Sequence, residues 1–344
     1  MEKKLEEGSD AAKNSPPHRV GFPRRSLLGL KGTWLKLVLV LIGLAALGLI
    51  MESRLLWDMP QTIVFDEDYF CKPRVLNAST FKYNSDHQFY SAMKKLNRGP
   101  VPTFRGMHSF LCDDAYRDQM QFAYCLPISG RKDEPYCAGA DRMDLFNIKS
   151  RRSICYASVL HMLLMEVYEE LKATGNTPNI MFGSLLGAVR NQSMIPFTED
   201  TDIGFVNEPK SSDELQEALL QKGYRMFFAG IWRVCVAPTH PLAGRLYDPS
   251  LPLTRKYTVP YVDLYEMVKV NESYWYVGEF EGSNGSLLPV DKVEPFSQVT
   301  INGMQFSTVN DPKFFLSDAY GEDYMTPKPR EDETNSTSAS DTGF

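Results

Sequence analysis

The sequence predicts an α/β fold in which a mixed sheet is flanked by helices. Apolar residues recur at helical spacing between positions 152 and 172, and short strand-like runs alternate with helical segments after them. Such interleaving is typical of a sheet with helices packed against it. The apolar content of 43% is ordinary for a globular protein, so the 344 residues can bury one large core or two modest ones.

The first 51 residues differ in composition from the rest. Residues 1–33 are polar, and we expect them to form a disordered cytosolic tail. Residues 34–51 are apolar except for Lys36. A helix of this length spans about 27 Å, which is close to the thickness of the bilayer core. We therefore expect a transmembrane helix at 34–51.

Charges beside this apolar segment predict its orientation. Basic residues, and no acidic ones, lie between positions 19 and 36. By the positive-inside rule the N-terminus stays in the cytosol and the bulk of the chain is lumenal. The expected protein is a single-pass type II protein of the endoplasmic reticulum or Golgi membrane, held by a signal anchor. A cleaved signal peptide is the alternative, because Ala46-Leu47-Gly48 resembles a cleavage site.

All the cysteines follow the apolar segment. An even number in an oxidising compartment favours disulfides, and we expect at least one within residues 112–155. Structural zinc and free buried thiols are the alternatives, although the cysteine spacing in this region is not that of a zinc ribbon. The cysteines are Cys71, Cys112, Cys125, Cys137, Cys155 and Cys235.

Asn-x-Ser/Thr sequons also lie beyond the apolar segment, which fits exposure to a lumen. The sequon at Asn191 falls inside the motif described below, where a glycan would obstruct the site, so we expect it to be unused. The sequons are at Asn77, Asn191, Asn271, Asn284 and Asn335.

Composition also divides the chain beyond the anchor. We interpret 52–100 as a stem and accessory region, 101–150 as a Cys-rich cap and 151–327 as a catalytic domain. Residues 328–344 are charged and rich in Ser and Thr, as expected for a disordered tail. The net charge of −6 argues against nucleic acid as a partner, because binding a phosphate backbone needs a basic surface.

Periodicity, capping and turn chemistry predict the elements of the catalytic domain. Helices are expected at 152–172, ending near Gly175; at 184–190; at 212–222, between a capping box at Ser211–Glu214 and Gly223; and from Asp311-Pro312 to about Tyr320. Strands are expected at 179–182, through Asp200 and Asp202, at 224–229 and 231–236, within 256–267 around Asp263, and at 299–306 as a hairpin with an Asn302-Gly303 turn.

Two acidic residues on one strand are the main chemical signal. Asp200 and Asp202 are two positions apart, so both carboxylates project from the same face of an extended chain. Carboxylate oxygens are the ligands that a hard divalent cation prefers. Asp263 lies between apolar neighbours in another strand, and the Gly183-Ser184 turn lets a phosphate approach the backbone. This combination suits metal-assisted transfer of a phosphate-containing group.

The order Gly-Ser, Asp-x-Asp and apolar-Asp-apolar resembles the nucleotidyltransferase superfamily. The longer sequence blocks around these residues resemble the LicD family of that superfamily, which includes fukutin and fukutin-related protein. The chain departs from the family pattern at Phe197, where the family has Trp, and at Thr198, where it has the first of three clustered acids. The matching blocks are Gly183 to Arg190, Ile195 to Ile203, Val262 to Tyr265, and Tyr320-Gly321 through Tyr324 to Pro327.

The resemblance implies a nucleotidyltransferase-like fold and transfer of a phospho-alcohol or sugar phosphate, such as phosphocholine or ribitol phosphate. The donor would be a nucleotide-diphosphate compound, with CMP leaving from a CDP-linked donor. The acceptor would be a hydroxyl of a glycan on a glycoprotein or glycolipid. The membrane would be contacted through the N-terminal helix alone.

Each site residue then has an expected role. Asp200, Asp202 and Asp263 would hold Mg²⁺ or Mn²⁺. Asp202 and Asp263 would be catalytic, with Asp263 either completing a second metal site or accepting the proton of the acceptor hydroxyl.

The remaining site residues are expected to bind substrate. Gly183 and Ser184 would contact phosphate at a helix start. Arg190 would either clamp a phosphate or orient the acids at Glu199 and Asp200.

Two other functions remain open. Asp-x-Asp also serves metal-dependent glycosyltransferases, although the preceding Gly-Ser and the third strand Asp argue against that class. A catalytically silent lumenal scaffold that retains the fold is the other alternative, and the departures at Phe197 and Thr198 leave room for it.

Overall fold

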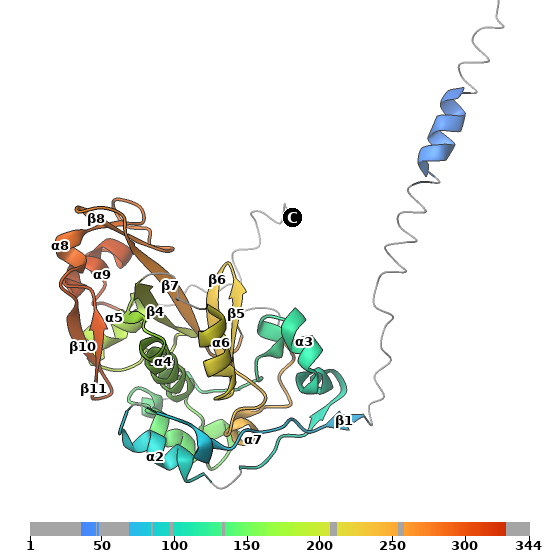
Figure 1. Cartoon of the computed structure of the whole chain (residues 1–344), viewed down its shortest axis with the longest axis horizontal. Coiled ribbons are helices and arrows are strands. Elements are labelled where there is room, and N and C mark those ends of the chain that lie inside the picture. Colours follow the sequence, from blue (N-terminus) through green and yellow to red (C-terminus); the bar gives the residue numbers. More distant parts are fainter. Residues whose placement is uncertain are drawn as a thin grey trace, which may run out of the picture. The chain divides into compact units, whose positions relative to one another are not determined.

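Figure 1 shows the computed structural model of the chain, which describes residues 36–45, 47, 69–83, 85–96, 99–132, 135–206, 212–253 and 258–327. The chain divides into two units, Met1–Val64 and Phe65–Phe344. In the first unit, residues 36–45 and 47 are helical. Within the described segments, no helix combines the length and the apolarity that crossing a membrane requires.

The transmembrane helix at 34–51 and the lumenal orientation therefore stay predictions. The tails at 1–33 and 328–344, with the sequon at Asn335, lie outside the described residues.

A seven-stranded mixed sheet forms the centre of the second unit. Its main path runs β3-β4-β7-β6-β5, and β8 and β9 extend it from β7. The β4–β7 pair is parallel and the other pairs are antiparallel, which confirms the predicted mixed sheet. The strands are β3 (Thr177–Ile180), β4 (Asp200–Val206), β5 (Tyr224–Ala229), β6 (Ile231–Val236), β7 (Tyr261–Lys269), β8 (Tyr274–Val277) and β9 (Leu287–Pro289).

The long strand β7 pairs with two different strands along one of its edges. The β4 strand occupies the other edge as far as Met267. On the first edge, β6 pairs with residues 261–264 and β8 pairs with residues 267–269. Among the described strands, a gap in this edge therefore lies beside Tyr265 and Glu266, where the N–H of Gly278 donates to the carbonyl oxygen of Glu266 at 2.9 Å.

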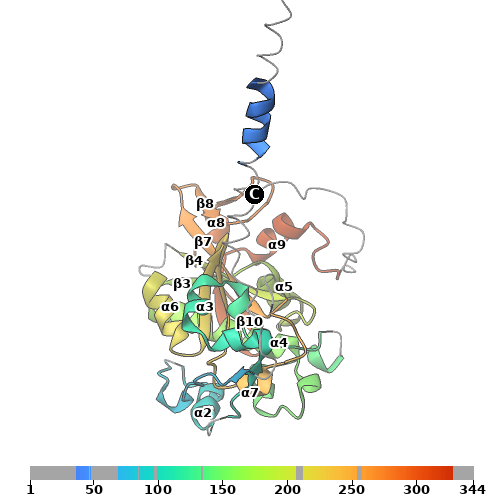
Figure 2. The same ribbon diagram turned by 90° about the vertical axis from the view of Figure 1, so that its right-hand side faces the viewer.

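Helices cover both faces of this sheet. The longest, α4, is buried along most of its length and contacts β3, β4, β6 and β7, while α6 packs on β5. The helix α5 contacts β4 and α9, and Figure 2 shows α2 and α7 at the opposite end of this unit from β8 and α8. The helices are α2 (Gln88–Lys94), α3 (Asp114–Gln119), α4 (Tyr156–Ala173), α5 (Phe182–Asn191), α6 (Ser212–Leu220), α7 (Ala243–Leu246), α8 (Val290–Val293) and α9 (Pro312–Tyr320).

Turn chemistry predicted several of these elements closely. The β5–β6 hairpin has the expected bounds. A second hairpin pairs β10 (Ser297–Ile301) with β11 (Met304–Thr308) through Asn302 and Gly303, both of which have positive φ as a tight hairpin turn requires. The side chain of Asp311 caps α9, because it accepts a hydrogen bond from the N–H of Phe314.

Several predicted boundaries were wrong. The helix expected at 152–172 is Tyr156–Ala173, the one expected at 212–222 ends at Leu220, and the strand expected within 256–267 runs from Tyr261 to Lys269. The strand expected at 179–182 ends at Ile180, and α5 already begins at Phe182. The apolar run continues past the strand because Met181 and Phe182 also face the core, although the backbone has turned into the helix. Ser211, the expected start of the capping box of α6, lies outside the described residues.

The described residues between 69 and 150 form mainly short helical turns and loops. Their buried side chains, including Phe89, Phe104 and Leu126, belong to the same hydrophobic core as Val262 and Phe315. The division into stem, cap and catalytic domain stays a prediction. The remaining short elements are β1 (Phe70–Cys71), β2 (Phe104–Arg105) and 3₁₀ turns at Ala78–Thr80, Gly106–Cys112, Phe122–Tyr124, Pro135–Cys137, Arg142–Phe146 and Arg151–Ser153.

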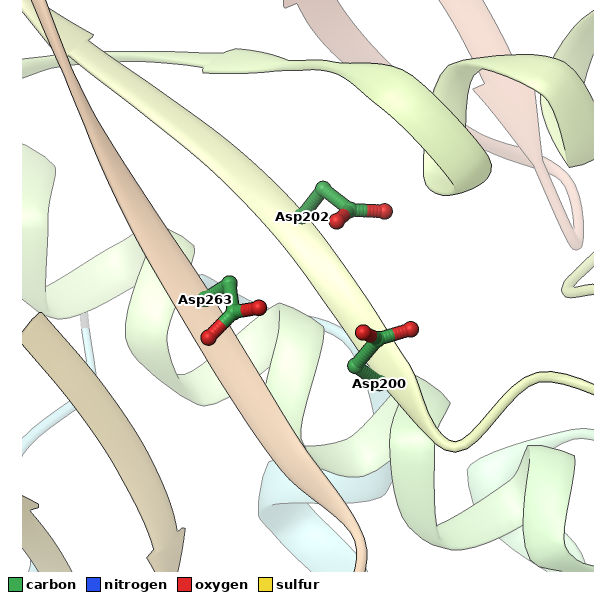
Figure 3. A group of neighbouring side chains, drawn as sticks. All are labelled: Asp200, Asp202 and Asp263. Atoms are coloured by element: carbon green, nitrogen blue, oxygen red, sulfur yellow. The ribbon is translucent and has the colours of Figure 1, made fainter. Parts of the chain in front are cut away.

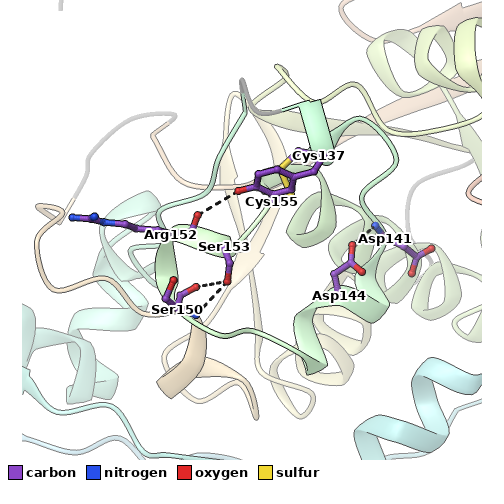
Figure 4. The surroundings of a disulfide bond; sticks show 8 residues. Cys137, Asp141, Asp144, Ser150, Arg152, Ser153 and Cys155 are labelled. Carbon is purple, nitrogen blue, oxygen red and sulfur yellow. Dashed lines mark hydrogen bonds between the residues drawn. A yellow bond between two sulfur atoms is a disulfide. The ribbon is translucent and has the colours of Figure 1, made fainter.

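All six cysteines form disulfides in the structure, namely Cys71–Cys112, Cys125–Cys235 and Cys137–Cys155. The last of these is the bond expected within 112–155, and it joins the 3₁₀ turn at Pro135–Cys137 to the start of α4 (Figure 4). Closing a loop of this length stabilises the fold by about 3 kcal/mol in the chain-entropy model. The Cys125–Cys235 bond ties the N-terminal part of the unit to β6.

Candidate active site

Three carboxylates from two neighbouring strands meet at one place in the structure. Asp200 and Asp202 project from β4, and Asp263 projects from β7 (Figure 3). One carboxylate oxygen of each lies within 4.8 Å of one from each of the others. The parallel register sets Asp202 directly opposite Asp263, so the period of two places all three side chains on the same face of the sheet.

The space around this cluster depends on a small residue in β4. Gly204 follows Asp202 on the same face of the strand. A Cβ at Gly204 would lie 2.7 Å from the sulfur of Met267 and 2.9 Å from a side-chain carbon of Met181. Glycine at this position therefore lets these two methionines pack against β4 without shifting.

Asp202 is held by the first turn of α5. The backbone N–H of Ser184 donates to Asp202 Oδ2 at 3.0 Å, and the Ser184 hydroxyl accepts from the N–H of Asp202 at 2.8 Å. The same hydroxyl lies 2.7 Å from Thr201 Oγ1. Ser184 thus orients a carboxylate in this structure, and its predicted contact with phosphate would require these bonds to be exchanged.

Gly183 and Phe182 shape the same turn. A Cβ at Gly183 would approach Asp202 Oδ2 to 3.2 Å, so the glycine leaves room for the carboxylate. Phe182 has a φ of 41°, a left-handed conformation that costs a non-glycine residue about 1–3 kcal/mol. Its ring packs at 4.6 Å from Tyr265 and 5.4 Å from Phe315, and this burial offsets the strain.

Asp200 is fixed by two hydroxyl groups. Thr198 donates to its Oδ1 at 2.8 Å, and Tyr261 donates to its Oδ2 at 3.3 Å. Thr198 is the position where the family pattern has an acid. In this chain position 198 therefore adds no negative charge to those of Asp200, Asp202 and Asp263. The Thr198 hydroxyl instead donates a hydrogen bond to Asp200.

The hydroxyl of Tyr265 lies between the other two acids. It is 3.4 Å from Asp202 Oδ1 and 3.3 Å from Asp263 Oδ2. Tyr265 belongs to the apolar-Asp-apolar-aromatic block, yet the sequence did not indicate a polar role for it. Its position shows how the two strands share one hydrogen-bond donor.

Arg233 is a site residue that sequence reasoning missed. It lies opposite Asp263 in the β6–β7 pair, and its Nε is 2.8 Å from Asp263 Oδ1. Both side chains are 7% exposed. The available signal was an arginine inside the apolar strand 231–236, since a buried arginine almost always has a carboxylate partner.

Burial and mutual repulsion disfavour ionisation of the acids. Burial, then the charges of Asp200 and Asp263, raise the pKa of Asp202 well above its usual range. Burial raises the pKa of Asp263 to about 7, with Arg233 acting against this and Asp200 adding to it. A bound cation would favour the charged form of every carboxylate in such a cluster.

The carboxylate geometry fits a small divalent cation. Oxygens that bind one Mg²⁺ at about 2.1 Å lie at most about 4.2 Å apart. The oxygens of Asp200, Asp202 and Asp263 are already within 4.8 Å of one another, so a small contraction would bring them to bonding distance. An all-carboxylate set suits Mg²⁺ or Mn²⁺ better than a softer metal.

Arg190 contacts the backbone near the C-terminal end of the described chain, and its two predicted roles stay predictions. Its Nε donates to the backbone carbonyl oxygen of Tyr324 at 2.7 Å, and its Nη2 contacts the same oxygen. The fourth sequence block, Tyr320 to Pro327, is thereby held against α5.

Tyr320 lies at the end of α9. Partial burial and the charges of Asp202 and Asp200 raise the pKa of its phenol, which therefore lies near the acids.

Lys132 brings a further cation to the site from the disulfide-containing region. Its Nζ is 3.0 Å from Glu199 Oε1 and 4.4 Å from the centre of the Tyr156 ring. Glu199 and Asp200 both raise the pKa of Tyr156, after burial, so this group borders the acid cluster. Lys132 stays partly exposed, and nothing in the sequence around it indicated this position.

Comparison with known proteins agrees with the geometry. Residues 177–311 match the family model described as LicD/FKTN/FKRP, nucleotidyltransferase domain. Two uncharacterized proteins, one from Rickettsia typhi and one from Rickettsia prowazekii, are each 35% identical to this chain over 77 and 79 residues, or 22% of its length. The match spans 25% and 29% of the length of these relatives.

Proposed function

The chain belongs to the LicD family through its nucleotidyltransferase domain at residues 177–311, a family of phosphotransferase type, and on this basis we propose a specific reaction. The protein transfers a phospho-alcohol or sugar phosphate from a nucleotide-diphosphate donor to a hydroxyl of a glycan. A new bond forms between the acceptor oxygen and phosphorus, and the bond from phosphorus to the nucleotide breaks. The nucleotide leaves as a monophosphate, which is CMP if the donor is CDP-linked.

One observation carries this proposal: Asp200, Asp202 and Asp263 converge across the parallel β4–β7 pair. Phosphoryl transfer needs negative charge neutralised on the phosphate and the acceptor oxygen held in line with the leaving group. Three aligned carboxylates beside a partly exposed lysine supply a cation site and a place for the phosphate. Asp200 is partly exposed, whereas Asp202 and Asp263 are buried, so a substrate would approach the cluster from the side of Asp200.

The acids would hold one or two Mg²⁺ or Mn²⁺ ions. When bound, such an ion neutralises charge on the diphosphate and on the departing nucleotide. The hydrogen bonds from Ser184 keep Asp202 oriented. Thr198 and Tyr261 do the same for Asp200.

Asp263 is best placed to act on the acceptor. Its Oδ1 is held by Arg233 and its Oδ2 by Tyr265, so the carboxylate has one fixed orientation. We propose that it accepts the proton of the attacking hydroxyl as the new phosphoester bond forms. Lys132, released from Glu199, would contact the transferred phosphate.

We place this reaction in the lumen of the endoplasmic reticulum or Golgi. The support is the set of three disulfides, which form and persist in oxidising compartments. Protease added to sealed microsomes should leave residues 69–327 intact. Digestion of this region without detergent would contradict the lumenal placement.

The proposed reaction is tested by incubating the purified chain with Mn²⁺, a glycan mixture and CDP-choline, CDP-ribitol, UDP-sugars or GDP-sugars. Mass spectrometry of the products is expected to show glycans heavier by a substituted phosphate, together with the released nucleoside monophosphate, which is CMP, UMP or GMP according to the donor. Products heavier by a sugar alone would instead indicate an Asp-x-Asp glycosyltransferase.

A catalytically silent scaffold is the second candidate. The Arg233–Asp263 pair favours it, because a buried arginine neutralises Asp263 without a metal. Absence of any divalent cation–nucleotide binding by calorimetry would support this candidate against the enzyme.

A further inference from the structure

A cavity of about 500 Å³ lies on the face of the sheet opposite the acids. The strand register establishes this placement. Arg233 pairs with Asp263 on the acid face, so the neighbouring pair, Trp232 and Leu264, points to the other face. Trp232 and Leu264 line the cavity, together with Phe205 of β4. Its size is within the range of about 300–1,000 Å³ that small-ligand sites occupy.

The lining combines aromatic rings with carboxylates. The aromatic rings are those of Phe228 near the end of β5, Trp232 of β6 and Tyr276 of β8. The side chains of Phe228 and Tyr276 are exposed. Glu266 and Glu279 also line the cavity, and the described lining residues include no lysine, arginine or histidine. An anionic ligand would be repelled here, which excludes the nucleotide-diphosphate donor.

The cavity adjoins the gap in the sheet beside the active site. Its lining includes Gly230 at the β5–β6 turn and Gly278 after β8, the two segments that flank the gap at Tyr265 and Glu266. Leu264 and Glu266, which also line the cavity, lie on β7 one and three residues after Asp263. A ligand in the cavity therefore lies next to the strand that carries Asp263.

We propose that this cavity binds a neutral segment of the glycan acceptor that contains more than one sugar ring. The apolar faces of sugar rings would stack on Trp232 and Tyr276, and sugar hydroxyls would donate to Glu266 and Glu279. The volume exceeds what a single small cation such as choline fills, so an extended neutral ligand of more than one ring is the better match. This inference rests on the proposed function, and it adds that acceptor recognition is separated from the donor by the sheet.

Binding is tested without turnover. Saturation-transfer NMR is recorded on the purified full chain without metal or nucleotide. The neutral probes are lactose, N-acetyllactosamine and chitobiose, and choline chloride is the probe for the alternative ligand class, a small cation. At least one neutral saccharide is expected to show transfer to its ring protons. Tyr276→Ala and Glu266→Gln should weaken that binding about tenfold or more.

The matched control is Tyr274→Ala. Tyr274 is exposed on the same strand as Tyr276 and is not among the lining residues, so its removal should leave binding unchanged. A thermal melt of each variant shows whether it is folded. In a transfer assay, Tyr276→Ala should raise the KM for acceptor with the KM for donor unaltered.

The outcomes separate this inference from the proposed reaction. Saccharide binding that Tyr276→Ala removes, in a protein without transferase activity, would support the cavity and refute the reaction. Active enzyme with an unchanged acceptor KM in Tyr276→Ala would refute the cavity alone. Binding of choline in place of every saccharide, or of none of these probes at millimolar concentration, would also overturn the inference.

Discussion

Arg233 and Asp263 face each other across the β6–β7 pair, with Nε and Oδ1 2.8 Å apart and both side chains 7% exposed. The same Asp263 shares Tyr265 with Asp202. The acid cluster is therefore tied through one residue to a positive charge on the neighbouring strand. Stability and activity depend on this pair in different ways.

Removing Arg233 alone should destabilise the fold. Arg233→Met leaves a buried carboxylate without its cation, which typically costs about 3–5 kcal/mol. The double variant Arg233→Met/Asp263→Asn should regain most of that free energy of unfolding, because both charges are then absent, but it should remain inactive. Urea denaturation measures the first effect and product formation the second. Equal stability of the single and double variants would show that the pair is not coupled.

Removing either acid of β4 should abolish transfer and leave the fold intact. Asp200→Asn and Asp202→Asn keep the side-chain shape but remove a charge that attracts a divalent ion. The lost stabilisation of the transition state should reduce kcat/KM by roughly 10³-fold or more. The melting temperature should hold or rise, because fewer like charges repel one another. Near-normal turnover by Asp200→Asn that EDTA still inhibits would exclude the assigned metal ligands.

Ser184→Ala distinguishes the observed role of this serine from its predicted one. If the hydroxyl orients Asp202, kcat should fall by about 10- to 100-fold, as is typical when a hydrogen-bond partner of a metal ligand is lost. The KM for donor should then change little. A rise in donor KM at constant kcat would instead indicate a direct phosphate contact. Steady-state kinetics with varied donor decides between these two outcomes.

Glu166, in the buried face of α4, should make the stability depend on pH. Burial raises its pKa to about 8, with Lys222 and Arg142 acting against this and Glu170 adding to it. Between the usual glutamate pKa and 8 the unfolded chain has released this proton while the folded chain keeps it. The free energy of unfolding therefore falls as pH rises through this interval, by up to a few kcal/mol.

Glu166→Gln removes that dependence. The variant should be more stable than the original chain at pH 8 and similar to it at pH 4.5. Glu169→Gln, on the same helix and partly exposed, is the matched control and should keep the original pH profile. Urea denaturation at several pH values measures all three. A variant profile parallel to that of the unmodified chain would assign the pH dependence to other groups.

The sequence alone determined the features that a few neighbouring residues encode. The spacing of Asp200 and Asp202 placed both carboxylates on one face of a strand, and Asn302-Gly303 specified a tight hairpin turn. The helical period of α4 and the cap of α9 by Asp311 were likewise readable. Propensity, periodicity and turn chemistry act over one or two turns of chain, so these signals survive without any tertiary context.

Only the tertiary structure decided which distant residues meet. Strand register set Asp263 beside both Asp202 and Arg233, and a shift by one residue would have turned these side chains to the opposite face. The connectivity of the disulfides also depends on how separate segments pack.

The tertiary structure also decided the contacts of two residues that were predicted to bind substrate and that bind protein atoms in the structure. Ser184 is bonded to Asp202, and Arg190 to the carbonyl oxygen of Tyr324, 134 residues away in the chain. A motif specifies the type of residue at each position. The three-dimensional packing of the strands and helices specifies which atom each side chain reaches.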